Sequence, residues 1–205
     1  MGKITEISPQ AKDKTRVNVY IDGAFVCGLS LETAVKYRLK AGAEIDEERL
    51  KEIEFDSERQ TALEKAVGHI SKSMKTEREI ALFLSRKGYG DAVVSFILEK
   101  LKSYGYADDA AYARAYVSAQ KGKKGARLIG AALRAKGVRE ETIADALRDV
   151  EQDGEAARKA AEKYMRGKGR EEKEIQKLYR HLISRGFSYE EASAVAKEYR
   201  ECSEF

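Results

Sequence analysis

The chain has 205 residues, of which 36% are charged, with one proline, no tryptophan and a formal net charge of +4. This length allows one sizeable core or two to four small modules, and the composition favours exposed helices over a β-sandwich. The modest net charge excludes a histone-like polycation but permits local basic patches. No apolar run approaches the ~20 residues that span a bilayer, and no signal-peptide core opens the chain, so we expect a cytoplasmic protein without membrane contact.

Residues 1–56 carry strand patterns and are predicted to form a small segment that contains a β-hairpin and helices. The alternation over Arg16–Ile21, followed by Asp22-Gly23, predicts a type I′ turn, because both central residues of that turn need positive φ. Ser30 is placed to cap a short helix, and Asp46 to cap another that runs towards residue 55. Further strands are expected over Ile4–Ser8 and Ala24–Cys27. An isolated hairpin is marginal in water, so this segment should pack on its neighbours or on a partner.

A period of 49 residues organises the rest of the chain. Leucines and glycines recur at this spacing without a gap, as Leu84, Leu133 and Leu182 and as Gly88, Gly137 and Gly186. A gap-free period of this length indicates a tandem array of one supersecondary unit. The pattern predicts three helices in each unit, and the repeated glycine is expected to end the second helix as a C′ residue.

The fold class is therefore predicted to be mainly α, with three tandem three-helix repeats in an elongated array. The repeats are placed at 57–107, 108–153 and 154–205, with Asp153-Gly154 marking the last boundary. Their third helices are expected over Asp91–Tyr104, Glu140–Val150 and Tyr189–Arg200. Asp108 is a good N-cap, and capping boxes are predicted for Thr76 with Glu79 and for Ser188 with Glu191. A repeat of ~50 residues is marginally stable alone.

Positive charge concentrates in the second repeat. Between Ala110 and Arg139 there is no acidic residue, whereas eight are basic. The repeat also copies basic positions, which predicts a stripe suited to a polyanionic or acidic track. The candidate contact residues are Lys121, Lys123, Lys124, Arg127 and Arg134, with Lys72, Lys75 and Arg170 in other parts of the array. The alternative is that duplication copied charges needed only for the solubility of exposed helices.

Four tyrosines cluster near the junction of the first and second repeats: Tyr104, Tyr106, Tyr112 and Tyr116. They suit either stacking on bases or a partner, or packing in the core at helical spacing, and we favour core packing.

The sequence shows no pattern of a catalytic, cofactor or metal site. His69 and His181 are isolated, and Cys27 and Cys202 lie far apart without a CxxC partner, so neither zinc nor a disulfide is expected. No P-loop, GxSxG or GxGxxG motif is present. We therefore expect no enzyme activity, cofactor or metal.

The central stretch resembles the signature of the RecX family of bacterial regulators of the RecA recombinase. The residues that carry this resemblance are Gly105–Ala113, then Gly125, Ile129, Leu133 and Lys136–Val138. The segment from Lys3 through the hairpin to Gly42–Asp46 is similar to the extension of longer members. The resemblance therefore covers nearly the whole chain, although the third repeat departs from it, with Gln176 where the others have arginine.

The resemblance implies a protein of DNA repair, recombination and the SOS response that is not an enzyme. Such proteins bind RecA filaments on single-stranded DNA, lie along the helical groove, and usually depress ATP hydrolysis, strand exchange and coprotease activity. Some also bind DNA weakly. We expect this chain to be a monomer whose elongated array of repeats contacts two or more RecA protomers at once.

The alternative is a stand-alone DNA-binding helical module that competes for DNA. It predicts tight binding to naked DNA, with log affinity falling by about 0.9 per phosphate contact per log unit of salt. The net charge of +4 argues against it. Direct base reading is not expected, because no helix shows the side chains that pair with base edges.

Overall fold

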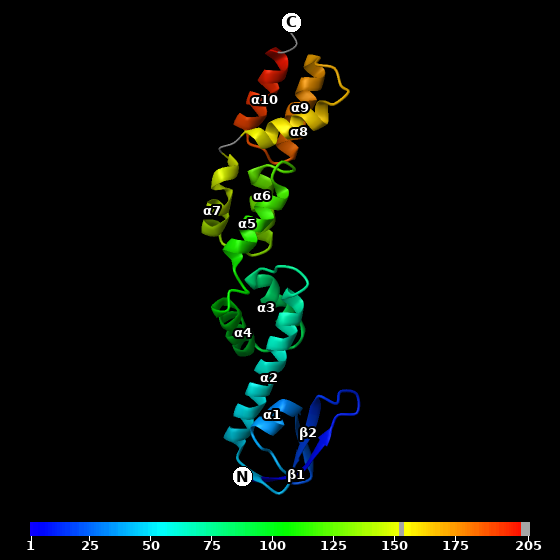
Figure 1. Ribbon diagram of the computed structural model, residues 1–205, viewed down its shortest axis with the longest axis vertical. Coiled ribbons are helices and arrows are strands. Elements are labelled where there is room, and N and C mark those ends of the chain that lie inside the picture. Colours follow the sequence, from blue (N-terminus) through cyan, green and yellow to red (C-terminus); the bar gives the residue numbers. More distant parts are fainter. Residues whose placement is uncertain (152–153, 202–205) are drawn as a thin grey trace. The chain divides into compact units, whose positions relative to one another are not determined.

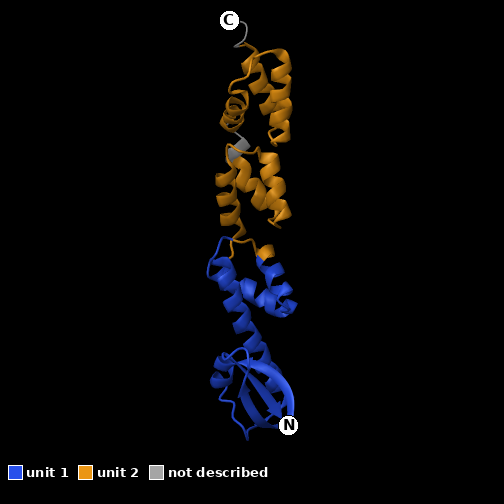
Figure 2. Cartoon of the chain, turned by 90° about the vertical axis from the view of Figure 1, so that its right-hand side faces the viewer, with its two compact units in different colours: residues 1–74, 80–106 blue, residues 75–79, 107–205 orange. Residues whose placement is uncertain are grey.

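A computed structural model of the chain describes residues 1–151 and 154–201. The chain divides into two compact units, one made of residues 1–74 with 80–106 and the other of residues 75–79 with 107–205 (Figure 2). Asp153, at the predicted boundary, and Cys202 lie outside the described residues.

The first unit begins with a small antiparallel sheet, in the order β3-β2-β1-β4 (Figure 1). Its strands are β1 (Gly2–Pro9), β2 (Arg16–Ile21), β3 (Ala24–Ser30) and β4 (Glu44–Ile45). The predicted hairpin is confirmed, because Ile21 pairs with Ala24 and the two turn residues, Asp22 and Gly23, have φ of 49° and 83°. The sequence did not reveal β4, because two residues are too few to show an alternating pattern.

Two helices cover the sheet's core. The first, α1 (Leu31–Lys36), is capped by Ser30, and the second, α2 (Glu47–Ile70), by Asp46, which accepts a hydrogen bond from the Arg49 N–H at 2.7 Å. We expected the second helix to run towards residue 55 and the first three-helix repeat to begin at residue 57, but a single helix covers both stretches. It continues to Ile70, because it contains no proline and no glycine before Gly68 in its last turn, so α2 serves both the sheet and the first three-helix set.

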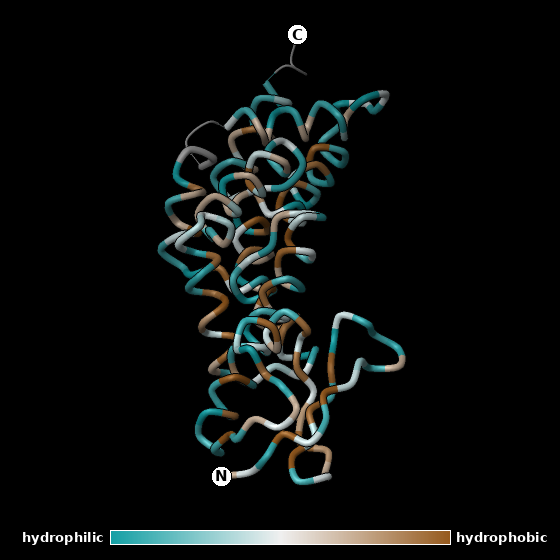
Figure 3. Tube along the Cα trace, turned by 60° about the horizontal axis from the view of Figure 1, so that its bottom comes forward, coloured by the Kyte–Doolittle hydropathy of each residue, from teal (hydrophilic) through white to brown (hydrophobic). Residues whose placement is uncertain are grey.

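The remaining helices follow the predicted period. They are α3 (Glu77–Arg86), α4 (Asp91–Ser103), α5 (Asp109–Gln120), α6 (Ala126–Ala135), α7 (Glu140–Glu151), α8 (Glu155–Met165), α9 (Glu172–Ser184) and α10 (Tyr189–Glu201). The three predicted third helices correspond to α4, α7 and α10, with ends within a residue of those expected. Hydrophobic and hydrophilic residues are interspersed along these helices (Figure 3), and an amphipathic helix places the hydrophobic ones three or four positions apart.

The glycine stops are confirmed. Gly88, Gly137 and Gly186 have φ near +90°, and the residue after each donates to the carbonyl of the repeated leucine. This pair of features defines a Schellman motif, which favours glycine because a Cβ is strained at positive φ. The repeated leucines Leu84, Leu133 and Leu182 have no exposed surface. The mainly helical fold with tandem three-helix repeats is thus as predicted.

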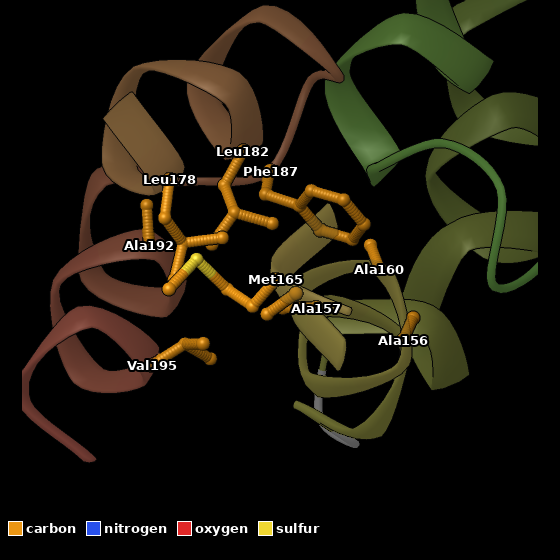
Figure 4. Close-up of a cluster of buried hydrophobic side chains, with 10 residues drawn as sticks. Ala156, Ala157, Ala160, Met165, Leu178, Leu182, Phe187, Ala192 and Val195 are labelled. Atoms are coloured by element: carbon orange, nitrogen blue, oxygen red, sulfur yellow. The ribbon is translucent and has the colours of Figure 1, made fainter. Parts of the chain in front are cut away.

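The three helices of the third repeat enclose a hydrophobic core of their own. Met165 from α8 meets Leu178 and Leu182 from α9, with Val195 of α10 and Phe187 completing the cluster (Figure 4). Small alanines on α8 allow this close approach. Among the described residues, no helix is both long enough and apolar enough to cross a membrane.

Candidate interaction surface

The basic stretch predicted from the sequence forms the turn between α5 and α6 in the second unit. Lys121 ends α5 with extended ψ, Gly122 follows with φ of 78°, and Gly125 is the N-cap of α6. A Cβ on Gly125 would overlap the main chain of Gly186, so glycine is required there by close packing rather than by φ. The turn is therefore built around a contact with the third repeat.

Hydrogen bonds to main-chain carbonyls hold this turn against the end of α9. The Gly125 N–H donates to the Arg185 carbonyl at 2.9 Å, and the Arg127 N–H to the Gly186 carbonyl at 3.2 Å. The Arg127 guanidinium also donates to the Ile183 carbonyl at 3.0 Å, and Arg185 donates back to the carbonyl of Lys123. Arg127 is thus partly engaged in joining the repeats.

A second junction of the same kind lies 49 residues earlier, also within the second unit. The Thr76 hydroxyl donates to the Lys136 carbonyl at 2.8 Å, and the Lys136 ammonium lies 2.6 Å from a Glu79 carboxylate oxygen. Burial alone would raise the pKa of the Glu79 carboxyl, but Lys136 and the Thr76 N–H outweigh it and hold that pKa below its ordinary value. The Glu79 carboxylate, helped by Tyr112, raises the pKa of Lys136 to about 12.

The lysines of the α5–α6 turn lie at its surface. Lys121 and Lys123 are exposed, and Lys124 is half-buried. The Lys123 ammonium donates to the Ala119 carbonyl at 3.0 Å, so it is held near the turn by a neutral group and keeps its charge uncompensated there. Three cations within four residues, with no carboxylate in the stretch, attract an anionic partner.

A groove of about 790 Å³ lies beside this turn, between α6, α7 and the start of α10. Gly130, Ile143, Leu147 and Phe187 are among the residues that line it. A Cβ at Gly130 would lie 3.3 Å from the Leu147 side chain, so the glycine keeps the two helices close. This groove was not predicted from the sequence, although the small residues on α6 are a signal of such a hollow.

Arg134, a predicted contact residue, lies on the edge of the groove. Its guanidinium forms a bidentate pair with Glu140, with one N–O distance of 2.7 Å. Glu140 raises the pKa of Arg134, and Arg134 in turn lowers the pKa of Glu140. A partner that binds Arg134 would therefore compete with the Glu140 carboxylate for its guanidinium.

The other predicted contact residues are distributed over both units. In the second unit, Lys75 is half-buried, and Arg170 is exposed between α8 and α9, 5.7 Å from the ring centre of Tyr199. Lys72 is exposed and belongs to the first unit. Of the predicted contact residues, Arg127 and Arg134 line the same groove. The role of these residues, and of the repeated column to which Lys72 and Arg170 belong, stays a prediction.

The tyrosines divide into two kinds. Tyr112 and Tyr116 stack with ring centres 6.2 Å apart and pack on the core of the second repeat, which confirms the predicted core packing for these two residues. That prediction is wrong for Tyr104 and Tyr106, which are 58% and 61% exposed. They follow the end of α4, where the helical periodicity on which the prediction rested no longer applies.

The two isolated histidines stack on aromatic rings, and the described cysteine is buried. His69 stacks on Phe83 and His181 on Tyr164, with ring centres 4.0 and 4.3 Å apart. Burial, and to a smaller extent hydrogen bonding to Glu54, raises the pKa of the Cys27 thiol to about 12, so the thiol is protonated at neutral pH. In the parts of the chain that the structure describes, no three His, Cys, Asp or Glu residues gather as metal ligands.

Comparison with known proteins matches three parts of the chain to family models. They are described as the regulatory protein RecX N-terminal domain (residues 2–46), the second three-helix domain of RecX (108–147) and its third three-helix domain (151–195). A crystal structure of a regulatory protein RecX has a TM-score of 0.70 and 31% identity, covering 96% of this chain and all of that one. The crystal structure of RecX from Lactobacillus salivarius, 23% identical with a TM-score of 0.65 over 70% of this chain and 97% of that one, shows the same fold.

Two similar curated proteins are both named regulatory protein RecX. The one from Bacillus licheniformis is 34% identical over 97% of this chain and 78% of its own length. The one from Clostridium perfringens strain SM101 is 33% identical over 96% of each. On this similarity, together with the three matched domains, the chain belongs to the RecX family of regulatory proteins.

Proposed function

We propose that this protein binds RecA filaments on single-stranded DNA and depresses their ATP hydrolysis, strand exchange and coprotease activity. Membership of the RecX family, whose expected role is the regulation of RecA, carries this proposal. The protein acts as a cytoplasmic monomer and without a cofactor. Its contribution is binding alone, and no residue is assigned a catalytic role.

The contact surface in this proposal is the α5–α6 turn. Its support is the exposed charge of Lys121 and Lys123 beside Lys124, in a stretch from Ala110 to Arg139 with no acidic residue. Arg127 holds the turn to the third repeat, and Arg134 lines the neighbouring groove. The turn is thus fixed in position before a partner arrives, which lowers the entropy lost on binding.

Tandem repeats suit a partner that is itself repetitive. Each repeat offers a weak contact, and once one is made the others act at a high effective concentration. Contacts that link neighbouring RecA protomers would resist the conformational cycle that accompanies ATP hydrolysis. Occupation of the filament groove would also exclude duplex DNA and coprotease substrates.

The test is the single-stranded-DNA-dependent ATPase of the host's RecA, measured while this protein is titrated at constant DNA. The proposal expects inhibition at protein concentrations well below those that saturate the DNA. No effect until the DNA is coated would instead support the alternative, a stand-alone module that competes for DNA. The same titration against naked DNA at several salt concentrations separates the two, because phosphate binding weakens steeply with salt.

A charge reversal at Lys123 and Lys124 tests the contact surface itself. The double change to glutamate leaves the Lys123 carbonyl in place, so the bond from Arg185 can persist. We expect filament binding to weaken about tenfold or more, with helical content unchanged. The matched control is the same double change at Lys12 and Lys14, exposed residues of the first unit, which alters net charge equally. Equal weakening by both variants would show a general charge effect and remove the turn from the proposal.

A further inference from the structure

The first unit carries an apolar groove of about 710 Å³ against α1 that the proposed function does not use. Leu31 and Val35, one helical turn apart on α1, remain 46% and 68% exposed, and Ile7 and Leu39 extend the same surface. Ala34, the remaining apolar residue of this short helix, is buried. The α1 groove, as we call this surface, therefore leaves an apolar face uncovered.

Arg38, which lines the α1 groove, has a backbone conformation that disfavours any side chain. It ends α1 in a Schellman motif, in which the Arg38 N–H donates to Val35 and the Leu39 N–H to the Ala34 carbonyl, and its φ is +52°. Four other helices end in the same way, and each has glycine at this position: Gly88, Gly105, Gly137 and Gly186. Glycine would relieve the strain at no cost in hydrogen bonding, so the fold alone gives no reason for an arginine here.

The charge around the α1 groove is positive and uncompensated. Arg38 and Lys40 line it, and no acidic residue does. Among the described residues, neither cation forms an ion pair. Two carboxylates of the same unit, on α1 and α2, are engaged elsewhere, because Glu32 accepts from Gln60 and Asp56 pairs with Lys36.

We propose that the α1 groove docks an acidic, amphipathic helical segment of a partner protein. An apolar strip of such a helix would cover Leu31 and Val35, and its flanking carboxylates would meet Arg38 and Lys40. A guanidinium can bind a carboxylate with two hydrogen bonds, which is a use for an arginine that the backbone disfavours. The apolar floor and the presence of only two cations argue against nucleic acid, which needs a run of phosphate contacts.

The test uses the intact, isotope-labelled protein and three synthetic peptides. The first is a helical peptide with leucines on one face and glutamates beside them, the second has those glutamates changed to lysine, and the third has the leucines changed to serine. We expect only the first to bind, with NMR shift changes at Leu31, Val35 and Leu39. Shifts that map to other residues, or equal binding of the lysine peptide, would overturn the proposal.

Arg38→Gly provides a variant whose loss of binding cannot be attributed to unfolding, since glycine suits the left-handed conformation better. We expect it to bind the acidic peptide about tenfold more weakly, as the loss of a charge-assisted contact implies. Val35→Ser should weaken binding similarly, whereas Val67→Ser, at a residue of α2 that is 42% exposed, should not. Unchanged binding by Arg38→Gly would overturn the proposal.

Two other occupants are distinguished in the same experiment. Phosphatidylserine-containing vesicles that broaden the Leu31 and Val35 signals, when the acidic peptide does not shift them, would assign the groove to a membrane surface. Shifts at these residues that depend on protein concentration alone would assign it to a second copy of the chain. Either result contradicts the proposal. Because RecA is absent from these measurements, their failure leaves the proposed function unaffected, and the converse also holds.

Discussion

The Thr76 hydroxyl donates a hydrogen bond of 2.8 Å to the main-chain carbonyl of Lys136 within the second unit. Forty-nine residues later, the Gly125 N–H donates to the carbonyl of Arg185 in the same way. Both acceptors are C-cap residues, whose carbonyls have no partner inside their own helix. The start of one repeat's second helix thus satisfies the end of the next repeat's second helix, and the opposite partial charges of the two helix ends favour the contact.

Thr76→Ala removes both a helix cap and the bond to Lys136. Thr76 is fully buried, and its hydroxyl also accepts from the Glu79 N–H at 3.2 Å. We expect the free energy of unfolding to fall by about 2 kcal/mol, which combines a lost cap with a buried carbonyl left unpaired. Urea denaturation followed by circular dichroism measures the change.

Ser188→Ala is the matched control for the Thr76 variant. Ser188 and Glu191 form the same capping box, with the Glu191 N–H donating to the Ser188 hydroxyl at 3.1 Å, but this hydroxyl does not join two repeats. Its loss should cost about 1 kcal/mol. Equal costs for the two variants would show that the bond from Thr76 to Lys136 adds no stability.

Gly125→Ala tests the second junction by steric overlap. The added methyl group would collide with the main chain of Gly186, which cannot move without breaking the turn. We expect a loss of about 3 kcal/mol in unfolding free energy, at the upper end for overpacking. Gly90→Ala provides the comparison, because Gly90 is also an N-cap with negative φ but has open space around it, and it should cost about 0.5 kcal/mol. Similar stabilities of the two variants would mean that the repeats separate there without cost.

The ion pair between Glu79 and Lys136 predicts a dependence of stability on pH. The pKa of Glu79 is lowered from 4.5, so its contribution is present above about pH 4.5 and is lost as pH falls through the lower folded-state value. The pKa of Lys136 is raised to about 12, so its contribution is present below 10.5 and is lost as pH rises through about 12. The pair therefore stabilises the protein between these limits.

Glu79→Gln isolates this charge, because glutamine can still accept from the Thr76 N–H. At pH 7 we expect the variant to be less stable than the unsubstituted protein by about 1 kcal/mol, and the gap to close as pH falls below 4.5. Urea denaturation at a series of pH values measures this. A gap that stays constant down to pH 3 would show that packing, and not charge, accounts for the difference.

Arg38→Gly should increase stability rather than reduce it. The residue has φ of +52°, where a side chain costs about 1–2 kcal/mol relative to glycine, and the extra freedom of glycine in the unfolded chain offsets part of that gain. We expect a net gain of about 0.5 kcal/mol, measured by thermal or urea denaturation. A clear loss would show that the arginine has a structural partner in the folded protein.

Much of the fold followed from local signals in the sequence. The recurrence of Leu84 and Gly88 every 49 residues revealed the three repeats, because a helix that buries one face must repeat its apolar positions and then end. Asp22-Gly23 predicted the hairpin for an equally local reason, since few residues tolerate positive φ. By contrast, β4 and the full length of α2 were not predicted. A two-residue strand is too short to show a period, and no residue pattern in the sequence marks where α2 ends.

The candidate surface was only partly visible in the sequence. The charge of Lys121, Lys123 and Lys124 could be read directly, because it is a property of composition in one short stretch. That Arg127 binds the Ile183 carbonyl and Arg134 pairs with Glu140 depends on which residues meet across helices. No local pattern in the sequence shows which residues of different helices are in contact.

The sequence by itself determined the repeated helices, their caps and glycine stops, and the concentration of positive charge, because each depends on neighbouring residues along the chain. Only the tertiary structure showed that Gly125 is a glycine for close packing against Gly186, and that Arg38 carries a strained backbone beside an uncovered apolar groove. The physical reason is that burial and steric overlap depend on distances between residues far apart in sequence. Those distances exist only once the chain has folded.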